Sequence, residues 1–247
     1  MIDVRAAYEH VAERFAETVR KLTEQQAAAA VRSCPGWAVR DVLAHHVGLT
    51  MDFASGNAID VPDGVDFNGL AAVFANLAAR QVSERASRSV TEIVSEWESA
   101  APVTWAILCG ELSSVGFPLD PAIGQGVMIN VVVVHEGDVR QALGLPLPGE
   151  SAALALALGN YALMASLHLD ETGLGALRLD YGGRQKIVGT GDPVVTLRGT
   201  RNDLVRTIAF RRSREQILAM DWDGDPTDYV DVLPVYGVVD PANADVI

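Results

Sequence analysis

The sequence predicts an α+β protein, with a helical bundle over residues 1–170 followed by a small α/β domain with an antiparallel sheet over residues 171–247. Two patterns predict this division. Apolar residues recur at steps of three and four through most of the first part, which is the spacing of amphipathic helices. From residue 176 onward apolar and polar residues alternate, which is typical of strands. An alanine- and leucine-rich helix, expected from Ser151 to about Leu169, comes just before the change.

Composition limits the classes of protein that this chain can be. With 247 residues, 49% of them hydrophobic and 21% charged, the chain can bury a full core. A net charge of -13 argues against binding to nucleic acid or to an anionic membrane, because either partner needs clustered Lys and Arg. A small-molecule partner is therefore favoured.

Cellular location is predicted from what the sequence lacks. Its two cysteines are too few for a disulfide framework and have no zinc-finger spacing, so they are expected to be ordinary thiols in a reducing cytoplasm. No leader-like N-terminus and no uninterrupted apolar run of about 18 residues is found. We expect a cytoplasmic monomer or homodimer that does not enter a membrane.

The first two helices flank a Pro-Gly turn. The first is expected to begin near Val4, to continue into the alanines at 27–30 and to end before Cys34. The second follows Trp37, has Asp41 in its first turn, where a carboxylate suits the helix dipole, and ends near Gly56.

Residues 56–68 are expected to form a loop, after which the helical pattern resumes at Leu70. Ser89 and Glu92 stand at capping-box spacing and mark a further helix start. The pattern indicates a long bundle helix that is interrupted near residue 88.

Residues 127–134 are open to two interpretations. Val131 to Val134 are β-branched, which suits a buried strand. Asp120 and Pro121, however, supply a helix cap and a first-turn proline, and Gly144 supplies a stop. These boundaries favour a helix over about 121–143.

The second domain is expected to hold four antiparallel strands. Strands are predicted at 176–181, 185–188, 194–198 and 217–222, with the Gly182-Gly183 pair as a hairpin turn. A helix is expected to start at Thr200, and a last short helix to be capped by Asp225 and Pro226.

Three segments resemble the mycothiol-dependent maleylpyruvate isomerase family. They are the stretch from Cys34-Pro35-Gly36-Trp37 to His45, the stretch from His135-Glu136-Gly137-Asp138 to Gly144, and Arg211-Arg212 followed by Asp223-Gly224-Asp225. The resemblance spans nearly the whole chain. It implies a DinB-like up-down four-helix bundle followed by a small C-terminal domain.

The resemblance also implies a chemistry. Family enzymes bind a divalent metal, usually taken as zinc, and His45 and His135 match its two histidine ligands. Mycothiol, an actinobacterial thiol, would act as co-substrate and add to an electrophilic small molecule, as in the isomerisation of maleylpyruvate. Arg211 matches an arginine that binds the substrate carboxylate.

The sequence departs from the family at one ligand. The family has an acidic residue four positions before the later histidine, where this chain has Val131, which cannot ligate a metal. Substitutes would have to come from a small set: His46, Asp52, Glu136 or Asp138.

Several roles stay open on the sequence alone. Glu136 and Asp138 are candidate catalytic acid–base groups, although pairing with Arg140 is an alternative for both. Either Arg211 or Arg212 can instead pair with the many carboxylates.

Two functions therefore remain. The first is a metal-assisted, mycothiol-dependent isomerase or thiol S-transferase. The second is a metal-free member of the family that binds a small molecule or uses its pocket histidines for acid–base catalysis.

Overall fold

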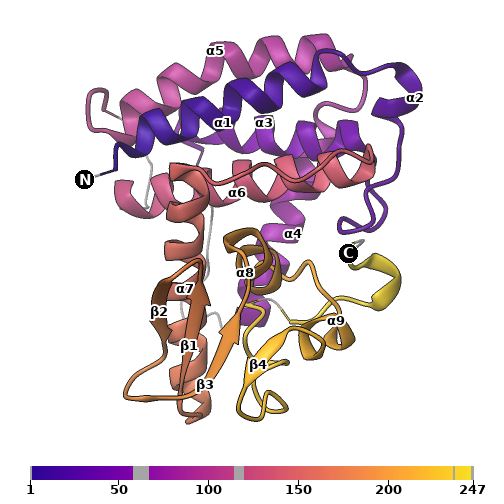
Figure 1. The fold of residues 1–247 in the computed structure, drawn as a ribbon. Helices are drawn as coiled ribbons and strands as arrows, with labels where there is room; N and C mark the ends of the chain where they lie inside the picture. The colour runs from indigo at the N-terminus through magenta and orange to yellow at the C-terminus, as the bar shows by residue number, and fades with distance from the viewer. Residues whose placement is uncertain (1, 58–66, 114–119, 236, 246–247) are drawn as a thin grey trace. The chain divides into compact units, whose positions relative to one another are not determined.

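The structure, a computed structural model, describes residues 2–57, 67–113, 120–235 and 237–245 (Figure 1). The chain divides into two compact units, Met1–Leu145 and Pro146–Ile247. The first is helical and the second combines helices with a four-stranded sheet, which confirms the α+β class. The division lies earlier than the boundary at residue 170 that the sequence suggests. The difference is helix α7 (Ala152–Thr172), which contacts α8 and β2 of the second unit.

The first unit is built around helix α3 (Val39–Ser55). Helices α1 (Val4–Val19), α5 (Val90–Leu108) and α6 (Pro121–Ala142) contact one another, and α3 contacts both α5 and α6 (Figure 1). Helix α4 (Phe67–Ser83) packs on α3 as well. Large apolar side chains fill the space between these helices; those that are almost fully buried include Tyr8, Phe15, Leu43, Trp105 and Met128.

The first predicted helix is in fact two. Helix α1 ends at Val19, and the short helix α2 (Glu24–Ala27) begins after Thr23. Thr23 accepts a hydrogen bond from the backbone of Gln26, and the Gln26 side chain accepts one from Thr23 N. This capping box starts a new helix where the apolar spacing alone suggested continuity.

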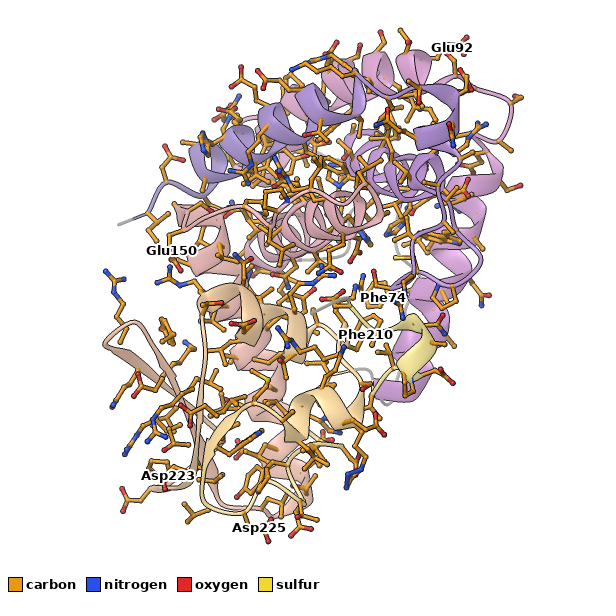
Figure 2. All side chains as sticks on the ribbon, turned by 45° about the vertical axis from the view of Figure 1, so that its right-hand side comes forward. Phe74, Glu92, Glu150, Phe210, Asp223 and Asp225 are labelled. Carbon is orange, nitrogen blue, oxygen red and sulfur yellow. The ribbon has the colours of Figure 1, made fainter. Side chains whose placement is uncertain are left out.

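The other helix boundaries in this unit follow the predicted caps. Helix α3 has its Asp41 carboxylate on the backbone N–H of Ala38 and ends at Gly56, whose φ of 69° only glycine adopts readily. Glu92 completes the capping box at the start of α5, where Figure 2 labels it. The predicted loop at 56–68 lies largely outside the described residues.

Residues 121–142 form a helix, as their boundaries predict. Asp120 accepts a hydrogen bond from Ala122 N, and Pro121 occupies the first turn. The valine-rich stretch is the buried core of α6, because a segment of this length with both caps can satisfy all of its backbone groups internally.

The sheet of the second unit has the order β2-β1-β3-β4, with strands Arg184–Val188, Ala176–Tyr181, Pro193–Arg198 and Asp221–Asp223 respectively. Strands β1 and β2 pair antiparallel, as do β3 and β4, but β1 and β3 pair parallel. The prediction of a purely antiparallel sheet is therefore wrong. Strand β2 ends opposite the start of β1, and Gly189 and Gly191, both with positive φ, return the chain there, so that β3 runs alongside β1.

Two predictions near the C-terminus are also wrong. The segment at 217–222 begins in helix α9 (Arg214–Leu218), where Ile217 is fully buried, and only its last residues enter β4. Instead of a capped helix, the chain after Pro226 forms turns, in which Tyr229 N and Val230 N both donate to the Pro226 carbonyl. Helix α8 (Arg201–Ile208) starts after Thr200 as predicted, and a 3-10 turn at Pro241–Asn243 follows.

Helix α7 has the length and hydropathy of a membrane-spanning helix, which is weak evidence by itself. Leu154, Ala157, Leu158 and Ala162 are buried, and the helix contacts α8 and β2. It therefore has the surroundings of the core helix of a small domain.

Candidate functional site

His45 on α3 and His135 on α6 face each other inside the first unit. Their ring centroids lie 5.1 Å apart and their planes meet at 85°. His135 is buried and His45 is half-buried. The structure thus brings together the two histidines that the sequence singles out as metal ligands.

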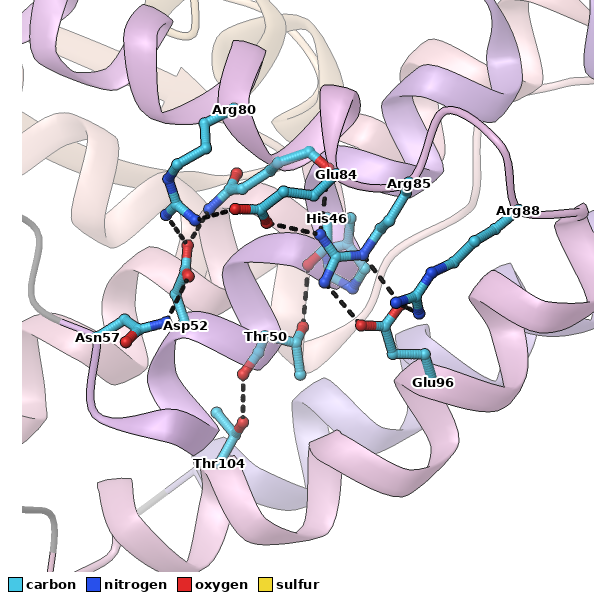
Figure 3. Close-up of polar contacts among 11 residues, drawn as sticks. His46, Thr50, Asp52, Asn57, Arg80, Glu84, Arg85, Arg88, Glu96 and Thr104 are labelled. Atoms are coloured by element: carbon cyan, nitrogen blue, oxygen red, sulfur yellow. Dashed lines mark hydrogen bonds and ion pairs between the residues drawn. The ribbon is translucent and has the colours of Figure 1, made fainter.

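The proton of His45 is fixed by a chain of polar side chains. The Nδ1 atom of His45 lies 2.7 Å from Oε1 of Gln81 on α4, and Nε2 of Gln81 donates to Asp52 at 2.6 Å. Arg80 also donates to Asp52, at 2.8 Å (Figure 3). Because Asp52 can only accept, the Gln81 amide must turn its oxygen toward His45. His45 then donates from Nδ1 and carries its lone pair on Nε2.

Gly48 makes this chain possible. A Cβ atom at this position of α3 would lie 2.5 Å from Cβ of Gln81 and 2.9 Å from a guanidinium nitrogen of Arg85. The absence of a side chain lets α4 approach α3 closely enough for Gln81 to reach His45.

Asp138 holds His135 in the same way. Its Oδ2 lies 2.9 Å from Nδ1 of His135, one helical turn earlier on α6. Its Oδ1 accepts from the Ser33 hydroxyl at 2.9 Å, and the Cys34 thiol donates to Oδ2 at 3.6 Å. The carboxylate is 1% exposed, so that it acts on His135 with little screening by water. His135 therefore also donates from Nδ1 and keeps its lone pair on Nε2.

Cys34 is placed by a tight turn directly before α3. Gly36 has a φ of 83°, and Trp37 N donates to the Cys34 carbonyl at 3.0 Å, which are features of a type II turn with Pro35 in its second position. The Trp37 ring lies 5.4 Å from the ring of His45. Sequence reasoning treated Cys34 as an ordinary thiol. The Pro-Gly turn ahead of the His45 helix was the signal that could have placed it at the site.

Cys34, His135 and Asp138 form a group of potential metal ligands. Among the described residues, their potential ligand atoms lie within 4.8 Å of one another. Val131 offers no donor, so two histidines alone would fall short of the three protein ligands usual for a catalytic zinc. Cys34 and Asp138 place a sulfur and a carboxylate donor beside His135, and both are donor types that bind zinc.

His46 and Asp52, the other suggested substitutes, are occupied elsewhere. His46 is fully buried against Tyr8 and Trp97, with its ring centroid 4.5 Å from that of Trp97. Burial, reinforced by the neighbouring His135 and His45, holds the pKa of His46 well below its usual value of 6.5. Asp52 is engaged by Arg80 and Gln81.

Glu136 belongs to an ion-pair cluster. Arg14 on α1 donates to both of its carboxylate oxygens at 2.6 Å, and Arg140 donates at 3.1 Å. Burial and two guanidinium partners favour a structural role that joins α1 to α6.

Arg211 and Arg212 lie in the second unit, in the turn after α8. Arg211 is buried, donates to the Ala209 carbonyl at 3.0 Å and lies over the ring of Phe210, 4.6 Å from its centroid. Phe210, labelled in Figure 2, has a φ of 51°, which is uncommon for a residue with a side chain. Arg212 donates to Asp203 at 2.5 Å. Arg211 remains the predicted carboxylate anchor.

A match to one family model supports the resemblance seen in the sequence. Residues 8–109 match the model of the mycothiol maleylpyruvate isomerase N-terminal domain. The crystal structure of the mycothiol-dependent maleylpyruvate isomerase is 12% identical, with a TM-score of 0.49 over 84% of this chain and 88% of that chain. A mutant of that enzyme with one histidine replaced by alanine gives the same identity and coverage and a TM-score of 0.48. A search of curated proteins gave no match.

The matched residues include the Cys34 turn and the His45 helix. The part of the chain that carries the Cys34 turn and His45 is therefore similar to the mycothiol maleylpyruvate isomerase N-terminal domain, and His135 lies beyond the matched residues.

Proposed function

We propose that this protein is a cytoplasmic, mycothiol-dependent isomerase or thiol S-transferase that acts on a small electrophile. The observation that supports this proposal most directly is the pair His45 and His135. Their ring centroids lie 5.1 Å apart, and each Nδ1 is hydrogen-bonded to an oxygen acceptor. The match to the mycothiol maleylpyruvate isomerase N-terminal domain supports the choice of thiol.

His45 and His135 would hold a divalent metal such as zinc through Nε2. When bound, the metal would supply positive charge that favours the deprotonated form of a thiol. Asp138 and Gln81 act as positioning residues, because each fixes the tautomer and direction of one imidazole. The Trp37 ring packs beside His45, with the two ring centroids 5.4 Å apart.

The chemistry expected of the co-substrate is nucleophilic. Its sulfur adds to the β-carbon of a double bond conjugated to a carbonyl, which leaves a single bond there and permits rotation. Departure of the sulfur then restores the double bond with inverted geometry and regenerates the thiol. A transferase would retain the carbon–sulfur bond. Arg211 is proposed to bind a carboxylate of the substrate.

A metal-free small-molecule binding protein or acid–base enzyme is the second candidate. Val131 favours it, because an aliphatic side chain stands one helical turn before His135 where a ligand could project beside it.

An activity assay distinguishes the two. Maleylpyruvate and a simple enone would each be followed with mycothiol, with glutathione and with no thiol. We expect turnover that requires mycothiol, falls at least about a hundredfold in His45→Gln and is retained in His10→Gln, a variant of an exposed histidine of α1. Arg211→Lys should raise KM only for the carboxylate substrate. Turnover that needs no thiol, or survives in His45→Gln, would overturn the proposal.

A further inference from the structure

We infer that Cys34 is a metal ligand, and that His45, His135 and the Cys34 thiolate together form a His2Cys site for zinc. This inference rests on the metal in the proposed function, but not on the substrate or on mycothiol. It gives a role to the one nucleophilic side chain in the cluster.

The separation of the two imidazoles is the first argument. Zinc–nitrogen bonds of about 2.0–2.1 Å at a tetrahedral centre place the centroids of two bound imidazoles roughly 5 Å apart. The rings of His45 and His135 have a centroid distance of 5.1 Å. Because both donate from Nδ1, both carry the lone pair that a metal requires on Nε2.

The partners of Asp138 give the second argument. Its Oδ2 faces Nδ1 of His135 and its Oδ1 accepts from Ser33. A carboxylate on the far nitrogen of a ligating imidazole is the usual outer-shell arrangement of metal sites. Asp138 therefore orients His135, and the third protein ligand of the metal must come from another residue.

Cys34 is the donor in reach. Its Sγ lies within 4.8 Å of a ring nitrogen of His135 and donates to Oδ2 of Asp138, so Sγ must turn from Asp138 toward Nε2 to reach a metal bound there. Nitrogen and sulfur ligands of one tetrahedral zinc lie roughly 3.5 Å apart. Rotation about the single χ1 torsion of Cys34 moves Sγ over a distance of this order. Zinc binding would release the proton that the thiol now donates to Asp138.

The charge and the chemical softness of the Cys34 thiolate agree with its assignment as a zinc ligand. One thiolate gives the zinc site a net charge of +1, the same as a carboxylate at position 131 would give. A thiolate also favours zinc and cobalt over the hard cations magnesium and manganese. Three protein ligands leave one position for the sulfur of a co-substrate.

Cobalt provides a readout that is independent of catalysis. Chelator-treated full-length protein titrated with Co²⁺ should develop visible bands of a tetrahedral site and a near-ultraviolet thiolate-to-cobalt charge-transfer band. Cys34→Ser should lose the charge-transfer band and weaken zinc binding at least about tenfold. Cys109→Ser is the matched control, since Cys109, the other cysteine of the chain, is exposed after α5, and it should retain both.

Two further measurements keep the inference falsifiable if Cys34→Ser folds poorly. In the wild type, zinc but not magnesium should slow alkylation of Cys34 by iodoacetamide, read by mass spectrometry, and leave Cys109 unprotected. The double variant Cys34→Ser, Val131→Glu should regain zinc affinity without the charge-transfer band, because residue 131 lies one turn before His135.

A charge-transfer band that persists in Cys34→Ser, cobalt binding without such a band in the wild type, or no metal binding at all would each overturn the inference. Protein that binds cobalt through Cys34 yet shows no thiol-dependent turnover would instead contradict the proposed activity alone.

Discussion

His45 and His46 are neighbours in sequence with opposite surroundings. The His45 ring lies among His135, Trp37 and Gln81, and its proton position is set by a polar chain. His46 points into the bundle core, with Phe15 and Trp97 around it, and its Nδ1 has no hydrogen-bond partner among the described residues. Residues adjacent on a helix project about 100° apart, which explains the difference.

His46 predicts a dependence of stability on pH. Because its folded pKa lies well below the unfolded value of about 6.5, the unfolded chain binds the proton more readily. Neutral His46 therefore contributes stability at pH values above the unfolded pKa, and this contribution is lost as the pH falls below that pKa. The contribution of His46 to the free energy of unfolding should approach a slope of about 1.4 kcal/mol per pH unit as the pH falls well below this value.

Urea unfolding between about pH 7.5 and 5.5 would measure this slope. His46→Gln should show a smaller slope than the wild type, and His10→Gln, on the exposed face of α1, an unchanged one. Equal slopes in the wild type and His46→Gln would contradict the assignment.

Residue chemistry was only partly predictable from the sequence. His45 and His135 could be selected because each lies in a distinctive motif. Gln81 could not, since an isolated amide in a helix carries no signal and acquires its role only when α4 packs against α3. Cys34 is intermediate, because the turn that positions it was visible but the partner across the bundle, Asp138, was not recognised as its neighbour.

At the scale of elements, the ion pair between Arg14 and Glu136 joins α1 to α6. Glu136 is 1% exposed and Arg14 approaches both of its oxygens. Hydrogen bonding to Glu136 raises the pKa of Arg14 further above its ordinary value, so that the guanidinium stays charged at any accessible pH.

Arg14→Met should therefore lower the free energy of unfolding by about 2–3 kcal/mol, since the buried carboxylate retains only Arg140. Arg5→Met, which removes an exposed partner of Glu9 on the same helix, should have little effect. Chemical denaturation of both variants gives the comparison. Equal free energies of unfolding for Arg14→Met and Arg5→Met would show that the burial of Glu136 does not require Arg14.

Element boundaries in the first unit were predicted well where a cap marked them and poorly where only periodicity was available, whereas the cap at Asp225 in the second unit begins turns rather than a helix. The caps at Asp120 and Ser89 identified α6 and α5, whereas the break between α1 and α2 was missed. The direction of β3 was not predictable, because it depends on the edge of β1 to which the chain returns. Local alternation specifies a strand but not its partner.

At the scale of the whole molecule, α7 decides between a membrane protein and one that folds in water. Its buried face includes Ala157, which is fully buried, while Leu163 on the opposite face is 62% exposed. The burial of one face against α8 and β2 indicates a core helix, and the net charge of -13 does not favour anionic lipid.

We expect the full chain to stay in the supernatant after high-speed centrifugation without detergent. Ala157→Asp should destabilise the second unit by about 3 kcal/mol or more, because it buries a charge. Leu163→Asp should change stability by no more than about 0.5 kcal/mol. If the chain instead sediments with membranes and Leu163→Asp abolishes this sedimentation, α7 would be identified as a membrane segment.

Gly48 has a consequence for how this sequence can vary. In a helix interior, replacement of glycine by alanine ordinarily stabilises by about 1 kcal/mol, and this exchange is a common choice when proteins are engineered for heat resistance. Here the added methyl group would meet Gln81, 2.5 Å away. Displacing that amide would free His45, which lies nearly one helical turn earlier on α3, to exchange its tautomer. A routine stabilising substitution would therefore change which ring nitrogen of His45 carries the proton.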